Sequence, residues 1–235
     1  MKITVKTTLL PAENRGTFIT IDVTDASPTF GIKTAVQAEG CPPAVIDWGD
    51  GIQTGLDTLT HTYATPGRYT VAISDAIAEL GVSTSSATTV YAATYAPMIA
   101  AVYSNAQKLT EVSPATFLNA CNMTSFDMRE TPIVKAVANI LCQCSSLTDL
   151  SGLPSGITSV NTRSFYKCTG LTGRVDLPNL RSFTGGNVTN APFAYCPGVT
   201  EIHILKVNEE SVKASPSFPT APTLGAVNAT LFFDP

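Results

Sequence analysis

Histidine and charged side chains are scarce in this chain of 235 residues, and each shortage argues against a class of function. The two histidines, His61 and His203, lie in different halves of the sequence. A Ser-His-Asp or Cys-His catalytic group would therefore have to be built across both halves. The motifs of phosphate-binding loops, dinucleotide-binding turns, hydrolase nucleophile elbows and zinc proteases do not occur. A glycosidase that uses a pair of carboxylates remains formally possible, but no spacing in the sequence marks such a pair. We expect no enzymatic activity, no catalytic residues and no cofactor.

The charge and hydropathy of the sequence argue against nucleic acid and membranes as partners. Charged residues make up only 14% of the chain, and the net charge is −4. Neither half carries the excess of Lys and Arg that nucleic acid or an anionic lipid surface requires. No run of about 18 apolar residues exists, so we predict no membrane insertion. The first eight residues alternate like a strand and lack the apolar core of a secretory signal peptide. Export by another route, removal of a signal, and a role without export all stay open.

Thr, Ser, Gly and Pro are common, which favours short strands and turns and a mostly β fold. Residues 1–93 show period-two alternation at Thr17–Val23, Phe30–Val36 and Tyr69–Ile73, with Gly- and Pro-containing breakers between these stretches. Strands at this spacing predict a small antiparallel sandwich.

One phrase of this half is specific. A strand brings the only tryptophan, Trp48, into the core and is followed by the turn Gly49-Asp50-Gly51. His61-x-Tyr63 and Pro66-Gly67-Arg68-Tyr69 follow in order. This pattern resembles the PKD family of immunoglobulin-like domains, which implies a PKD-like β-sandwich over residues 1–93. Its structural signature residues here are Trp48, Asp50, Gly51, His61, Tyr63, Gly67 and Tyr69.

Two chemical interpretations of this region compete with structural ones. Asp47, Asp50 and Asp57 could collect calcium, but Asp residues in turns more often accept backbone N–H groups, and the spacing does not match a dedicated calcium loop. His61 could be a general base, but a strand histidine beside Tyr63 is more often packed and hydrogen-bonded. We favour the structural interpretation of each and predict no metal site.

A short phrase recurs in the second half: an apolar residue, Cys three residues later, and usually an aliphatic residue three after that. The copies are Leu118-x-x-Cys121, Leu141-x-x-Cys144-x-x-Leu147, Phe165-x-x-Cys168-x-x-Leu171 and Phe193-x-x-Cys196-x-x-Val199. Successive cysteines are 23, 24 and 28 residues apart, which indicates a solenoid. We predict that Cys121, Cys144, Cys168 and Cys196 form a buried ladder of free thiols, because equivalent positions of a solenoid stack near or beyond disulfide reach. Cys142-x-Cys144 could be half of a metal site, but a second pair of ligands is missing.

Strands are expected after the cysteines, at Thr124–Met128, Leu147–Leu150, Leu171–Leu177 and Val199–Ile204. This arrangement resembles the BspA-like (Treponema-type) leucine-rich repeats, which implies a solenoid with short parallel strands over residues 94–235. Residues 82–95 read as a linker, and Thr89–Tyr91 could form a last edge strand. The tail, residues 206–235, contains a helical turn around Glu209–Lys213 and a strand at Ala229–Phe233, and is predicted to be the C-terminal cap.

The two resemblances together imply a bacterial surface or secreted adhesion protein that binds a host protein, a matrix protein or a glycan. The candidate ligand face comprises the residues expected to point outward on the strand face, near Thr148, Asp149, Arg174, Asp176, Glu201 and His203. The competing interpretation of these residues is a solvated face, and that of Tyr166 and Tyr195 is packing between repeats. A structural subunit of a surface or phage-like particle is the alternative function. The oligomeric state stays open.

Overall fold

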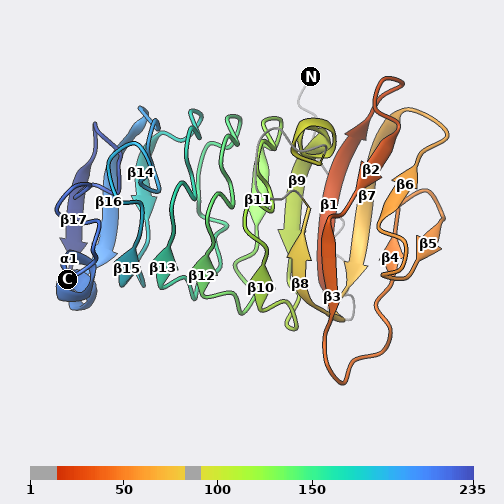
Figure 1. Ribbon diagram of the computed structural model, residues 1–235, viewed down its shortest axis with the longest axis horizontal. Helices are drawn as coiled ribbons and strands as arrows, with labels where there is room; N and C mark the ends of the chain where they lie inside the picture. Colours follow the sequence, from red (N-terminus) through yellow and green to blue (C-terminus); the bar gives the residue numbers. More distant parts are fainter. Residues whose placement is uncertain (1–14, 83–90) are drawn as a thin grey trace.

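The computed structural model (Figure 1) describes residues 15–82 and 91–235. The fold is mostly β and contains a solenoid of about five turns with parallel strands. The strands lie side by side along the long axis of the molecule, in sequence order from β9 to the C-terminal strand β17. The mostly-β composition and the parallel solenoid were both predicted from the sequence, and both are confirmed.

Within residues 15–82, the described part of the first half, there are eight strands in antiparallel pairs. β1 pairs with β7, β7 with β4, and β4 with β5, while β3 pairs with β8 and β2 with β6. The bounds are β1 Gly16–Val23, β2 Thr29–Gly31, β3 Thr34–Gln37, β4 Ile46–Asp47, β5 Gln53–Thr54, β6 Thr60–Thr62, β7 Gly67–Ser74 and β8 Ile77–Gly81. Antiparallel pairing is as expected, and the immunoglobulin-like class of this half stays a prediction.

The single strand predicted at Phe30–Val36 is wrong, because the chain changes partner in its middle. The N–H of Ile32 donates to the carbonyl of Leu59, whereas that of Lys33 donates to Gly81. The stretch is therefore split into β2 and β3, which belong to different sheets. Alternating hydrophobicity indicates an extended chain, but it does not reveal which neighbour each residue pairs with.

The two halves share one sheet. After the helical turns η1 (Tyr91–Tyr95) and η2 (Ala96–Met98), β9 (Ile99–Ser104) runs antiparallel to β1, and β11 (Ser125–Asp127) runs parallel to β9. In a second sheet, of order β10-β8-β3, β10 (Glu111–Val112) runs parallel to β8. A buried hydrogen bond of 2.8 Å between the hydroxyls of Thr17 and Ser104 joins β1 to β9. Pairing is thus continuous past the predicted domain boundary near residue 93. The linker and the optional edge strand predicted there fall largely on residues 83–90, outside the described residues.

Each solenoid turn contributes one segment to each of two faces. Face A consists of β9, β11, β14 (Gly173–Asp176), β16 (Val199–Leu205) and β17 (Thr230–Asp234). Face B consists of β10, β12 (Lys135–Ala136), β13 (Ser159–Val160) and β15 (Ser182–Phe183). All pairs within the solenoid are parallel. The two-residue strands of face B were not predicted, because two residues are too short to show a period.

The strand predicted at Leu147–Leu150 does not form. Its place on face A is occupied by an irregular segment, where Oδ1 of Asp149 accepts hydrogen bonds from the backbone N–H and the hydroxyl of Ser151. Such a local side-chain bond competes with strand pairing. The carbonyl of Gly152 accepts from the N–H of Met128, so the segment still contacts the preceding turn.

The cysteine ladder is confirmed for three of the four predicted members. Cys144, Cys168 and Cys196 are buried, and each thiol donates to a carbonyl of the preceding turn: Phe117, Leu141 and Phe165, at 3.2, 2.9 and 3.0 Å. All six cysteines of the chain are free thiols.

Cys121 is not a member of this column, which corrects the sequence prediction. The N–H of Ala120 donates to the carbonyl of Phe117 just as that of Cys144 donates to Leu141, so Ala120 is the equivalent of Cys144. Ala120 is fully buried, whereas Cys121 is partly exposed. The true phrase of this turn is therefore Phe117-x-x-Ala120-x-x-Met123, one residue earlier than the cysteine suggests.

The tail contains the two elements predicted for it. After the short turn η3 (Lys206–Asn208), α1 spans Glu209–Lys213. The strand β17 follows and pairs with β16 in parallel. The ring of Phe233 on β17 lies 5.6 Å from Nζ of Lys213 on α1. That residues 206–235 act as a cap stays a prediction.

Candidate functional site

Four of the five predicted ligand-face residues lie together on β14 and β16. Arg174 is in register with Glu201, and Asp176 with His203. On each strand these residues are two positions apart, so their side chains leave the same face while Val175 and Ile202 between them are buried in the core. Parallel pairing of two alternating strands thus brings a cation, a histidine and two carboxyl groups into one row.

β17 adds a fifth member that sequence reasoning missed. Asp234 pairs with Leu205 and brings its carboxyl group next to His203, with Nδ1 of His203 at 3.0 and 2.8 Å from the two carboxyl oxygens. The expected strand at Ala229–Phe233 was the available signal, since continuing its alternation places residues 230, 232 and 234 on one side. The register with β16 that positions Asp234 is visible only in the structure.

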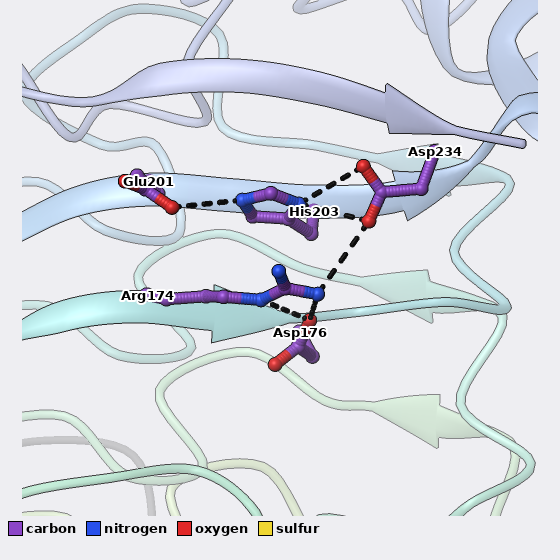
Figure 2. A network of polar contacts seen from close by, with 5 residues as sticks. All are labelled: Arg174, Asp176, Glu201, His203 and Asp234. Carbon is purple, nitrogen blue, oxygen red and sulfur yellow. Dashed lines mark hydrogen bonds and ion pairs between the residues drawn. The ribbon is translucent and has the colours of Figure 1, made fainter.

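These five side chains form the polar network shown in Figure 2. Nε2 of His203 lies 3.0 Å from Oε2 of Glu201, on the opposite side of the ring from Asp234. Arg174 donates to Oδ1 of Asp176 through Nε at 2.8 Å and through Nη2 at 2.6 Å, and the same Nη2 lies 3.5 Å from Asp234. Asp234 therefore connects the pair on β14 to the histidine on β16.

The network favours the doubly protonated form of His203. Burial by itself lowers the pKa of this imidazole, but hydrogen bonds to Asp234 and Glu201 outweigh it and raise the pKa above its ordinary value. Both ring nitrogens face carboxylates, and only an imidazolium donates from both. The ring of Phe232 stacks on His203 with centroids 4.6 Å apart and planes inclined by 13°. His203 is enclosed by these groups, with 10% of its side chain exposed, whereas the Arg174 side chain is 51% exposed.

Asp149, the fifth predicted residue, lies outside the network but beside it. It lines a depression of about 410 Å³ together with Arg174 and Asp176, between the irregular segment of the third turn and β14. Arg129 reaches the same depression. Hydrogen bonding to Asp127 chiefly raises the pKa of Arg129, and the charge of Asp149 adds to this effect. The site thus extends from β17 to the third turn.

The signature residues of the first half form a separate, structural cluster. Trp48 is fully buried, stacks on His61 at 5.3 Å, and accepts a hydrogen bond of 2.9 Å from the Tyr63 hydroxyl on its carbonyl. Tyr69 packs on Tyr63 at 4.2 Å. His61 also bonds to Asp50 at 2.7 Å. The predicted packed and hydrogen-bonded histidine is therefore confirmed.

The turn around Gly49 has the predicted conformation. Gly49 and Gly51 take φ values of 84° and 93°, which side chains other than glycine's rarely adopt. Oδ1 of Asp47 accepts from the N–H of Gly49, and Oδ1 of Asp50 accepts from that of Ile52. Both carboxylates thus stabilise the turn. Gly67 opens β7 after Pro66.

Tyr166 and Tyr195 pack on each other between successive turns, as their structural interpretation predicted. Their rings meet edge to face at 5.2 Å, and Lys167 lies over Tyr166 at 5.4 Å from the ring centre. Both belong to the corner that carries the cysteines, so they are not part of face A.

The described residues contain no convergent set of three His, Cys, Asp or Glu side chains suited to a metal ion. In the network, each ring nitrogen of His203 faces a different carboxyl group, so the three groups do not point at a common centre. Over the same residues, no helix is long and apolar enough to cross a membrane. What the site offers is a row of linked charged hydrogen-bonding groups beside a depression, in which His203 is nearly buried and Arg174 is half exposed.

Comparison with protein-family models, with curated proteins and with solved structures found no match to this chain.

Proposed function

We propose that this protein is a non-enzymatic binding protein that presents face A of its solenoid to a protein or glycan ligand. The observation that carries the proposal is the row of Arg174, Asp176, Glu201, His203 and Asp234, contributed by three neighbouring strands of one sheet and linked by direct contacts. Polar groups held on strands bind with little loss of side-chain freedom, because their geometry is set before the ligand arrives.

The balance of charge supports recognition by hydrogen bonds. The cation of Arg174 already has a carboxylate partner, Asp176, and His203 lies between two others. A ligand meeting this row encounters donors and acceptors of both signs, which suits a polar polymer surface better than nucleic acid.

The sequence resemblances suggest where such a protein works. BspA-like repeats and PKD-like domains are common in bacterial envelope and secreted proteins, so we place this chain at the cell surface or outside the cell. Both the resemblances and this localisation are part of the proposal. In this arrangement the first half serves as a spacer or a second contact module.

An array of matrix proteins and glycans tests the function directly. We expect at least one class of ligand to bind the wild-type protein and Arg174→Gln to weaken that binding. Arg181→Gln is the matched control, because Arg181 is equally an exposed arginine but lies beside β15 on face B. Absence of binding across the array, or equal effects of the two variants, would contradict the proposal.

A structural subunit of a surface or phage-like particle is the second candidate. It is favoured by the pairing of β17, which among the described residues is hydrogen-bonded to β16 alone and leaves its other edge available to a neighbouring subunit. Sedimentation velocity separates the two functions: concentration-dependent growth into large particles supports the structural subunit, and a small discrete species that binds on the array supports adhesion.

A further inference from the structure

Face A is interrupted at the third turn. β11 pairs with β9 and β14 pairs with β16, while the segment 147–152 between them belongs to no strand. The depression of about 410 Å³ lies at this interruption, which is within the range of small-ligand pockets, about 300–1,000 Å³. On one side β11 pairs with β9 in continuous register, and on the other β14 pairs with β16 with a register shift between Gly173 and Arg174. The pocket is a local feature of this turn.

The walls of the pocket are of two kinds. Its apolar part comes from core residues of two successive turns and from two prolines: Leu150, Leu153, Pro154, Val175, Leu177 and Pro178. Its polar part is charge-balanced, with two arginines, Arg129 and Arg174, and two aspartates, Asp149 and Asp176.

The two arginines are paired, and the two aspartates retain free hydrogen-bonding capacity. Arg129 is paired with Asp127 at 2.7 Å and Arg174 with Asp176 at 2.6 Å, so neither arginine is an uncompensated charge. The hydrogen bonds found for Asp149 and Asp176 among the described residues all involve Oδ1. Their Oδ2 atoms are available as acceptors, and charged acceptors form the stronger hydrogen bonds.

We propose that this pocket binds a neutral sugar unit, with the apolar wall against a C–H face of the ring and the Oδ2 atoms of Asp149 and Asp176 accepting from its hydroxyls. The proposal rests on the binding function proposed above and names its ligand class. The two aspartates would repel a strongly anionic ligand, and the two arginines would repel a cationic one. A neutral, hydroxyl-rich ligand uses both kinds of group. A peptide added as a strand is disfavoured, because β14 offers an edge of only four residues, shorter than a usual strand.

The test uses the full chain and a panel of methyl glycosides, both neutral and sulfated, observed by saturation-transfer NMR, followed by titration of the strongest binder. Ser151→Trp should fill the pocket, because Ser151 is exposed and lines it. Ser182→Trp is the matched control, an exposed serine on β15 of face B. We expect neutral glycosides to bind, Ser151→Trp to weaken binding about tenfold or more, and Ser182→Trp to have no effect.

A second variant guards against misfolding of the first. Asp149→Asn keeps the shape of the side chain and an acceptor for Ser151. It should weaken the binding of neutral glycosides several-fold while leaving the melting temperature of the protein unchanged. Neutral glycosides that bind equally to all variants, or binding of the sulfated glycosides alone, would overturn the pocket proposal. A protein ligand from the array that is lost in Arg174→Gln but kept in Ser151→Trp would also overturn it, while leaving the binding function intact. Absence of any ligand on the array and in the panel would overturn both.

Discussion

The thiol of Cys168 donates a hydrogen bond to the backbone carbonyl of Leu141, one solenoid turn earlier, across 2.9 Å. The same bond links Cys144 to Phe117 and Cys196 to Phe165. Three successive solenoid turns are thereby each tied to the turn before at a buried corner, where a small side chain with a weak donor fits between the layers.

This ladder predicts a difference between two Cys→Ser substitutions. Cys168→Ser buries a more polar hydroxyl with a shorter reach to Leu141 and should lower the free energy of unfolding by about 1–3 kcal/mol. Cys121→Ser, at the partly exposed position one residue out of register, should change it by less than about 0.5 kcal/mol. Urea denaturation of both variants is the measurement, and an equal cost at the two positions would argue against the column.

Thiol reactivity should divide the six cysteines into two groups. In the native protein, Cys41 and Cys121 are partly exposed and should react fastest with a thiol reagent, while the other four are buried. Burial chiefly raises the pKa of Cys142 to about 11 and that of Cys196 to about 12, which lowers the fraction of reactive thiolate at neutral pH. After unfolding, all six should titrate without a reductant. Finding fewer than six would show that a disulfide had formed.

Two glycines of the third turn should respond differently to alanine. A Cβ on Gly152 would lie 1.7 Å from the carbonyl oxygen of Phe126, so Gly152→Ala must displace the backbone of the second turn. We expect it to cost at least about 1–3 kcal/mol. A Cβ on Gly156 would approach Val134 no closer than 3.4 Å, so Gly156→Ala is the matched control and should be nearly neutral. Melting temperatures of both variants test this, and a tolerated Gly152→Ala would mean that the two turns are not in close contact.

Most of the repeat architecture was predictable from sequence, because the phrase around Cys144, Cys168 and Cys196 returns at nearly constant spacing. Cys121 misled the register, since Leu118-x-x-Cys121 imitates the phrase while Phe117 and Ala120 occupy the stacked positions. The irregular segment after Leu147 was also not predicted. There a local bond between Asp149 and Ser151 competes with an apolar pattern that otherwise favours a strand.

The candidate site was predictable as a set of outward residues, but its connections were not. Alternation along Val199–Ile204 indicated that Glu201 and His203 leave the same face. The pairing of His203 with Asp234 depends on the register of β17 against β16, which is set by packing between turns. The pocket at Asp149 depends on an interruption of the sheet that no periodic pattern reveals.

The His203 network predicts a pH-dependent contribution to stability. The pKa of His203 is raised in the folded protein, so the network's stabilisation is complete below the ordinary histidine pKa of 6.5 and is lost as the pH rises through the raised value. The charged groups facing the ring are Glu201 on its own strand, Asp234 on β17, and Arg174 on β14, which opposes protonation.

The measurement compares wild type with His203→Gln across pH. The difference in their free energies of unfolding should be larger at pH 5.5 than at pH 8. Asp234→Asn should shrink this pH dependence, because it removes the carboxylate that bonds to Nδ1. A difference that stays constant over this range would show that the pKa of His203 is not raised by folding.

Hydrogen exchange with and without the strongest ligand from the array tests most directly the claim that face A is the binding surface. We predict that protection is gained at Arg174–Asp176, Glu201–His203 and the segment 149–154, with little change on face B. Protection gained on β10, β12, β13 or β15 instead, or at neither face, would contradict the account.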